Sequence, residues 1–468
     1  MIPRLSRLPP PAFLFPLLAA ACGGPRDAPP TGPPATLAIT SVTVVHVADG
    51  TEERGRTVLI GGGRILKIGS AWQLKVPPGA RVVDGRRRFL IPGLWDMHVH
   101  LIHETGTLPL YLANGVTGVR DMGGPPAGLD VRDRVAREEL LGPRIVAAGP
   151  LVDGSKDAPW RITVETAAQA VAAVDSLTRL GADFIKIHNA LPPAAYAALA
   201  AAARERGIPF VGHIPRGVTA EQAVDAGQAS IEHVTALLET VLPPSATRSL
   251  TAFDAAVTSF LADRADPLFT RFAAHGVAFT PTLVAGRGAA YRVDPERRVD
   301  QDPRAVYLPR ALRDYWNDAF PQVRDASPRV VTGRRLVFEK SLPITAAAQR
   351  AAVTLLAGTD VGGRYVFPGF SLHDELELLV RAGLSPLEAL RTATVNPVRV
   401  LGLADSLGAV RPGYLADLVL LEVDPLDDIR STSHIAAVVR GGRLLDRAEL
   451  DRMLTEAMTR AKVAPKAP

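Results

Sequence analysis

The chain of 468 residues contains a single cysteine, Cys22, and this scarcity excludes an internal disulfide. It also disfavours a structural zinc site, because such sites tend to be closed and rich in cysteine. The sequence has no G-x-S-x-G motif of a serine nucleophile and no glycine-rich phosphate loop after an early strand. These absences disfavour a serine hydrolase and a doubly wound nucleotide-binding sheet.

A strong excess of one charge is also missing, since 53 lysines and arginines stand against 48 aspartates and glutamates. No dense basic block with interleaved aromatic residues occurs, so we expect no nucleic-acid partner. Hydrophobic residues make up 47% of the chain, with charged residues interspersed, which is typical of a globular protein. The expected partner is a small-molecule substrate, and the oligomeric state, including a homo-oligomer, stays open.

Residues 1–22 are typical of an export signal. Two arginines precede an apolar run, residues 11–21, that ends in small residues and is too short to span a membrane as a stable helix. Cys22 follows directly, as in the lipobox of a bacterial lipoprotein, so we predict lipidation there. The expected location is periplasmic or membrane-anchored in a bacterium, with plain secretion as the alternative. Residues 23–36 predict a flexible tether, so membrane contact is expected only through the lipid.

Short segments of alternating polarity follow the tether and return near the end of the chain. Neither group has enough strands to bury a core alone. We therefore predict that residues 37–91 and 406–447 form one composite β-sandwich. Residues 448–468 are predicted to form a C-terminal helix and tail.

Between these ends, in residues 92–405, apolar strand-like runs alternate with helical stretches. Eight such runs predict an α/β fold of the (β/α)₈ TIM-barrel type. The runs are residues 93–98, 116–121, 144–149, 183–188, 209–213, 230–234, 277–283 and 353–358. The connection from Val284 to Leu342 is unusually long and contains several aromatic residues, which favours a functional lid over plain disorder.

Polar residues lie at the carboxyl ends of these predicted strands, where barrel enzymes place their active sites. His98 and His100 are two residues apart on an extended run, so both side chains point the same way and can bind one divalent ion. Lys186 lies in the apolar run Phe184–Ile187, where a charged amine is costly. It is either paired, or extended to the rim, or converted by CO₂ to a carbamate.

His213, His233 and Asp360 lie at or just beyond the ends of three further runs. Each histidine alone is more often a hydrogen-bonded structural residue, but two on consecutive strands make a second metal plausible. An aspartate at a strand end is commonly the N-cap of the next helix. Asp360, however, is also expected to face the same end of the predicted barrel as the histidines. His188 shares the face of Lys186 and is either a substrate contact or a rim histidine.

Together, these motifs resemble the amidohydrolase superfamily, specifically its binuclear metal type and its imidazolonepropionase-like and prolidase-like branch. The resemblance covers about residues 37–450. Its motifs are Pro92–His100, Ile185–Ile187, Gly212–Pro215, Ile231–His233, Ala357–Asp360, Thr394–Gly402 and Gly408–Val419. The run after Ile187, His-Asn-Ala-Leu-Pro, departs from the small or glycine-rich run of dipeptide-cleaving members, which leaves the substrate open.

The resemblance implies two divalent ions, with Zn²⁺ as the default and manganese or iron as alternatives. His98, His100 and Asp360 would hold the inner ion, His213 and His233 would hold the outer ion, and a carbamate on Lys186 would bridge them.

The predicted activity is hydrolysis of an amide, peptide or cyclic amide bond of a small substrate by a metal-bridging hydroxide. Asp360 and His233 are the predicted catalytic residues, with Asp360 transferring a proton to the leaving group. Predicted substrate contacts are His188, Trp160, Arg120 and Arg364. The alternatives are a lactonase or other ester hydrolase with the same site, a metal-containing binding lipoprotein, and a metal-dependent deaminase, against which Lys186 argues.

Overall fold

The computed structural model describes residues 33–101, 105–155, 160–291, 302–310, 313, 327–363 and 365–463. The chain from Ala35 onward forms one compact unit by its internal contacts. The predicted export signal with Cys22 lies outside the described residues, as do most of the tether and Arg364. Among the helices described, none has both the length and the apolar character needed to cross a membrane. The predicted domain boundaries stay predictions.

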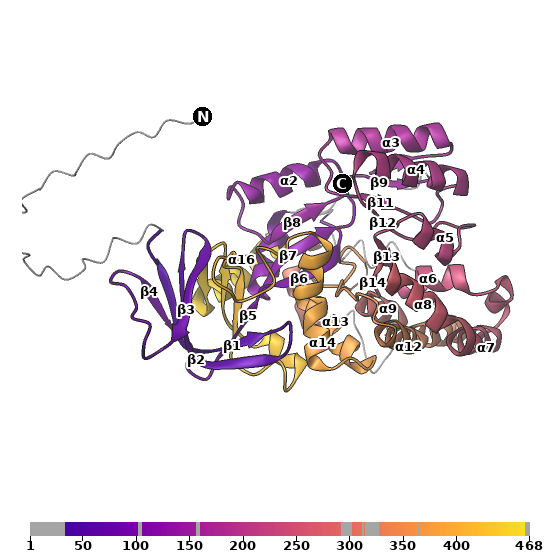
Figure 1. Ribbon diagram of the computed structural model, residues 1–468. Helices are drawn as coiled ribbons and strands as arrows, with labels where there is room; N and C mark the ends of the chain where they lie inside the picture. Colours follow the sequence, from indigo (N-terminus) through magenta and orange to yellow (C-terminus); the bar gives the residue numbers. More distant parts are fainter. Residues whose placement is uncertain are drawn as a thin grey trace, which may run out of the picture. The chain divides into compact units, whose positions relative to one another are not determined.

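The first sheet is built from both ends of the chain (Figure 1). Its eight strands are β1 (Leu37–His46), β2 (Thr51–Gly61), β3 (Arg64–Ser70), β4 (Arg81–Asp84), β5 (Phe89–Pro92), β15 (Leu418–Leu421), β16 (Ile435–Arg440) and β17 (Arg443–Asp446). The order is β17-β16-β15-β5-β1-β2-β3, with β4 paired to β1.

Strand β5 joins the two ends, because it runs parallel to β1 and antiparallel to β15. A separate apolar cluster packs on this sheet, and it includes Ile39, Ile60 and Leu418. The two ends therefore pair as predicted. The backbone hydrogen bonds define one sheet, however, and the predicted two-layer sandwich is not confirmed.

The central strands are parallel and form two further sheets. One has the order β6-β7-β8 and the other β10-β9-β11-β12-β13-β14. Their bounds are β6 (Leu94–Val99), β7 (Val116–Asp121), β8 (Arg144–Ala147), β9 (Leu151–Asp153), β10 (Arg161–Thr163), β11 (Ile185–Ile187), β12 (Phe210–Gly212), β13 (Ser230–Glu232) and β14 (Ala278–Thr280). Seven of the eight predicted runs thus contain one of these strands.

The eighth run contacts both sheets through isolated backbone bonds. The amide of Phe279 donates to the carbonyl of Thr354 at 3.0 Å, and the amide of Met97 donates to the carbonyl of Ala357 at 2.8 Å. On the other side, the amide of Asp183 donates to the carbonyl of Ala147 at 3.0 Å. The ladders themselves remain two sheets, so the structure establishes a mixed α/β fold and the closed barrel stays a prediction.

Helices follow most of the central strands. They are α1 (Leu108–Ala113), α2 (Ala127–Ala136), α3 (Ala167–Arg179), α4 (Pro193–Arg206), α5 (Ala220–Asp225), α6 (Val234–Val241), α7 (Leu250–Ser259), α8 (Ala265–Ala274), α9 (Leu283–Tyr291), α12 (Pro328–Arg350), α13 (Phe370–Arg381), α14 (Pro386–Thr392), α15 (Val395–Val400) and α16 (Arg447–Val463). Short 3₁₀ turns are η1 (Thr105–Thr107), η2 (Pro244–Arg248), η5 (Pro303–Tyr307) and η6 (Ile429–Ser433), and a π-helical turn, η3 (Phe260–Arg264), joins α7 to α8.

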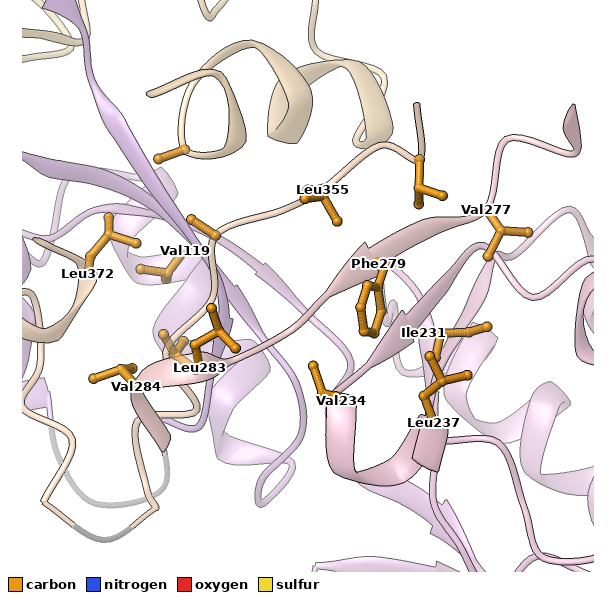
Figure 2. Close-up of a cluster of buried hydrophobic side chains, with 14 of the residues drawn as sticks. Val119, Ile231, Val234, Leu237, Val277, Phe279, Leu283, Val284, Leu355 and Leu372 are labelled. Carbon is orange, nitrogen blue, oxygen red and sulfur yellow. The ribbon is translucent and has the colours of Figure 1, made fainter. Parts of the chain in front are cut away.

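Local sequence explains where several helices start. Capping boxes open α3 at Thr166 with Gln169, and α14 at Ser385 with Glu388, so backbone N–H groups at these ends are satisfied. The main apolar core lies between these helices and the central strands. Figure 2 shows part of it, with Phe279 of β14 beside Leu355. Burying one such side chain contributes about 1.5–3 kcal/mol.

The described part of the long Val284–Leu342 connection packs against α13. Arg304 forms ion pairs with Asp302 at 2.6 Å and with Asp374 at 2.9 Å. The ring of Tyr307 stacks on Phe370 with centroids 5.2 Å apart. Three further aromatic residues of this connection, Tyr315, Trp316 and Phe320, lie outside the described residues.

Candidate active site

Three of the predicted ligands converge where β6 ends. His98 and His100 offer imidazole nitrogens, and Asp360 offers a carboxylate oxygen, with all three atoms within 4.8 Å of one another. Oδ1 of Asp360 lies 3.5 Å from Nε2 of each histidine. The Asp360 backbone has a φ of 61° and its amide donates to the carbonyl of His98 at 2.7 Å. A left-handed backbone is costly for an aspartate, so surrounding contacts must hold this turn.

The second nitrogen of each imidazole is held by a neighbouring group. Nδ1 of His98 lies 2.8 Å from a carboxylate oxygen of Glu232, and Nδ1 of His100 lies 2.7 Å from the carbonyl of Gly123. Because these oxygens accept, both Nδ1 atoms carry the proton and both Nε2 lone pairs are directed to the centre.

His213 and His233 lie next to this group. The ring of His233 is 4.5 Å from that of His98 and 4.8 Å from that of His213, measured between centroids. Nδ1 of His233 is 2.8 Å from the hydroxyl of Thr282, and Nδ1 of His213 contacts the side-chain oxygen of Asn189.

Lys186 is 1% exposed, and its amine is buried without a hydrogen-bond partner in the part of the chain that the structure describes. Nε2 of His98 is likewise buried and unpartnered there. A side chain at position 212 would meet the Lys186 chain at 2.9 Å, so Gly212, with a φ of 129°, leaves the space that the lysine occupies. The neutral, buried Nε2 of His98, without a hydrogen-bond partner among the described residues and 3.5 Å from the Asp360 carboxylate, fits a divalent cation as its partner.

Burial sets the protonation of these groups. It lowers the pKa of His98, His213 and His233 well below the usual value, assisted by the charge of Lys186, and it lowers the pKa of His100 to about 4. The histidines are therefore neutral near pH 7, as metal ligands must be.

The other two predicted ligands titrate much closer to neutrality. Burial raises the pKa of Asp360 to about 7, against the opposing charge of Lys186. Burial lowers the pKa of Lys186 to about 8. Both groups can therefore exchange a proton in the range where general acid–base chemistry operates.

A buried ion pair between Arg120 and Glu232 holds the His98 ring through its Nδ1 atom. The guanidinium of Arg120 donates to Glu232 at 2.8 Å, to Ser230 at 2.9 Å and to the carbonyl of Met97 at 2.7 Å. Arg120 is 1% exposed and Glu232 is fully buried. These positions favour an interior positioning role for Arg120 over the predicted contact with substrate.

Two further carboxylates were not singled out from the sequence. Asp96 is fully buried and accepts from the amide of Thr359 at 3.0 Å and from its hydroxyl at 2.6 Å, which ties β6 to the turn before Asp360. Asp153, at the end of β9, pairs with Arg161 and lies 3.3 Å from Nδ1 of His188. Only the position of Asp96 between the motif residues signalled a role.

The remaining predicted contacts fall in different places. The ring of His188 lies 4.2 Å from that of His213, so His188 borders the histidine cluster. Trp160 is half-buried just before β10. Arg364 and Cys22 lie outside the described residues, so nothing tests their predicted roles.

The sequence pattern of the Amidohydrolase family matches residues 89–445. The chain belongs to the amidohydrolase family. Imidazolonepropionase of Ralstonia nicotianae is 26% identical over 431 residues, which cover 86% of this chain and 95% of that protein. The structure of this chain is similar to the crystal structure of a putative prolidase from Bifidobacterium longum, with a TM-score of 0.67 and 25% sequence identity. The match covers 91% of this chain and 100% of the prolidase chain. The predicted superfamily and branch are thereby confirmed.

Ochratoxinase of Aspergillus niger is 40% identical over a shorter stretch of 102 residues. That stretch is 21% of this chain and spans only 20% of the ochratoxinase. The family therefore accounts for the fold and the type of enzyme, while the ligand and catalytic roles of individual residues stay predictions.

Proposed function

We propose that the protein is a hydrolase that cleaves a carbon–nitrogen bond, an amide, peptide or cyclic amide, of a small substrate. The observation that carries this proposal is the convergence of His98, His100 and Asp360, with both imidazoles oriented toward the same point. Family membership and the names of the similar proteins, an imidazolonepropionase and a prolidase, support amide chemistry. The central strands would form a closed (β/α)₈ barrel, with this site at their carboxyl ends.

The donor set suits two divalent cations, with zinc as the first choice. His98, His100 and Asp360 would hold one, and His213 and His233 would hold the other. When bound, such cations supply Lewis acidity that polarises a carbonyl and lowers the pKa of water.

Lys186 would complete the set as a carbamate. Its pKa of about 8 leaves a fraction of the amine neutral near pH 7, and the neutral amine can add to CO₂ with release of one proton. The product is an anion in a place where Nζ is buried without a hydrogen-bond partner among the described residues. Carbamylation would thus turn a costly buried amine into a ligand.

Asp360 would move the proton during the reaction. Its carboxylate, 3.5 Å from Nε2 of both His98 and His100, would accept a proton from water and return it to the leaving nitrogen as the bond breaks. His233, neutral and held at Nδ1 by Thr282, would stay fixed in orientation, and its other nitrogen would hold the second cation, which would polarise the reacting carbonyl. The Arg120–Glu232 pair holds the His98 ring in place during the same step.

A hydrolysis screen tests the proposal. The purified protein, supplied with zinc or manganese and bicarbonate, is incubated with dipeptides, N-acyl amino acids, cyclic amides and lactones. We expect amide cleavage that Asp360→Asn lowers by about 10²–10⁴-fold in kcat, the usual range for a general acid–base residue. His275→Gln, an exposed histidine after α8, is the matched control and should change kcat by less than about twofold. Cleavage of lactones alone, or full activity of Asp360→Asn, would contradict the assignment.

Export and lipidation of Cys22 are also part of the proposal, on the sequence pattern alone. Expression in a bacterial host with a labelled fatty acid tests them. Incorporation that disappears in Cys22→Ser would support the lipid anchor, and an unlabelled cytoplasmic product would contradict it.

A further inference from the structure

A cavity of about 540 Å³ lies among α6, η2, α7 and α12. This volume is within the range of ligand pockets, about 300–1,000 Å³. Most of the lining is apolar, with Leu238, Leu242, Phe253 and Val337 among its residues. The cavity can therefore take a branched aliphatic or aromatic group.

Residues that line the cavity are linked to the histidine cluster by hydrogen bonds through Asn189 and by short stretches of chain. Arg216, which lines it, follows His213 by three residues, and its amide donates to the carbonyl of Asn189 at 2.9 Å. The Asn189 side chain contacts Nδ1 of His213 on one side and donates to Glu239, also in the lining, at 3.3 Å on the other. Helix α6, which supplies Leu238, begins directly after His233.

Two charged residues of the described lining, Glu239 and Arg216, differ in whether their side chains already form a hydrogen bond. Glu239 already accepts the hydrogen bond from Asn189. The side chain of Arg216 is exposed, and no hydrogen bond or ion pair of its guanidinium occurs among the described contacts. A guanidinium presents a planar set of donors that matches a carboxylate, so Arg216 is a free anion-binding group at the edge of an apolar cavity.

We propose that this cavity binds the side chain of a large apolar amino acid within the substrate, and that Arg216 pairs with the free carboxylate of that residue. The substrate class is then an N-acyl or N-aminoacyl derivative of such an amino acid. This inference rests on the proposed amide hydrolysis for the reaction, but the binding it describes does not depend on turnover.

The test compares two probes that differ in charge, 3-phenylpropionate and 3-phenylpropan-1-ol, by calorimetric titration of the full chain. A charge-assisted hydrogen bond is expected to make the acid bind about 10–100-fold more tightly than the alcohol. Arg216→Met should reduce this preference to within about twofold, and Arg179→Met, an exposed arginine on α3, should keep it. Thr247→Trp, which fills the cavity from an exposed lining position, should weaken both probes.

Three results would overturn the inference. They are no binding of the acid at millimolar concentration, an equal affinity for both probes, and a preference that survives Arg216→Met. The last would show that a group other than Arg216 binds the carboxylate. If the binding pattern holds but no amide is cleaved, the proposed function fails and the cavity assignment stands. If amides are cleaved but Arg216→Met keeps the preference, only the cavity assignment fails.

Discussion

Replacement of Arg120 by methionine probes the buried ion pair beneath the candidate site. Methionine has a similar length but cannot donate to Glu232, Ser230 or the carbonyl of Met97. Glu232 is fully buried, so its carboxylate would lose its cationic partner without gaining water. Breaking a buried pair in this way costs about 3–5 kcal/mol. With a urea m-value of about 3 kcal/mol/M, the unfolding midpoint should fall by about 1–1.7 M.

A second variant separates the charge from the packing. Arg120→Met combined with Glu232→Gln removes both charges, so it should be more stable than Arg120→Met alone by at least about 1 kcal/mol. The His98 ring would then lose its carboxylate partner, and zinc affinity should fall by about 10–100-fold. Urea titration followed by fluorescence gives the stabilities, and competition with a chelator gives the affinity. A midpoint shift below about 0.3 M for Arg120→Met, or a double variant no more stable than the single one, would refute the reasoning.

Three further variants test separate contacts. Burial raises the pKa of Glu375 to about 8 from 4.5, despite hydrogen bonds from two backbone amides, so the folded state binds the proton more tightly. The stability that protonated Glu375 adds to the folded state is complete below pH 4.5 and is lost as the pH rises through 8. The urea midpoint should therefore fall more from pH 6 to pH 9 in the parent than in Glu375→Gln. Equal falls in the two proteins would contradict this. Asp417→Ala removes the 2.5 Å ion pair with Arg144 that links the composite sheet to β8, and the urea midpoint should reveal a loss of about 3 kcal/mol; an unchanged midpoint would exclude that link. Thr282→Val keeps the shape but removes the hydroxyl beside His233, so chelator competition should show zinc binding weakened by about tenfold, whereas unchanged affinity would argue against His233 as a ligand.

Much of the fold follows from local patterns. Alternating polarity predicts β1 over Leu37–His46 with the bounds that the structure has. The apolar runs predict seven of the nine central strands, since a strand buried on both faces needs continuous apolar residues, but β9 and β10, three residues each, were missed. Strand β5 was missed because Phe89–Pro92 is four residues long and its pairing with β15 is set by contacts over more than 300 residues.

Some residues of the candidate site could also be predicted from local sequence patterns, whereas their long-range contacts could not. The histidines and Asp360 could be identified because their residue types and strand-end positions are local features. The pairing of Arg120 with Glu232 could not, since 112 residues separate them and only the tertiary structure brings them together. The side chain of Arg120 is buried in the interior, where its guanidinium donates hydrogen bonds to Glu232 and Ser230. An arginine in an apolar run predicts a special role but does not name the partner.

We propose that the histidine cluster, Lys186 and Asp360 bind metal, and metal content by mass spectrometry tests this most directly. The parent, Lys186→Ala and the control His275→Gln would be grown with zinc and bicarbonate and then purified. We expect roughly two metal ions per chain in the parent and in the control, and fewer in Lys186→Ala, because the bridging ligand is lost. A parent chain that carries no metal, or a Lys186→Ala chain that keeps the full content, would contradict the account.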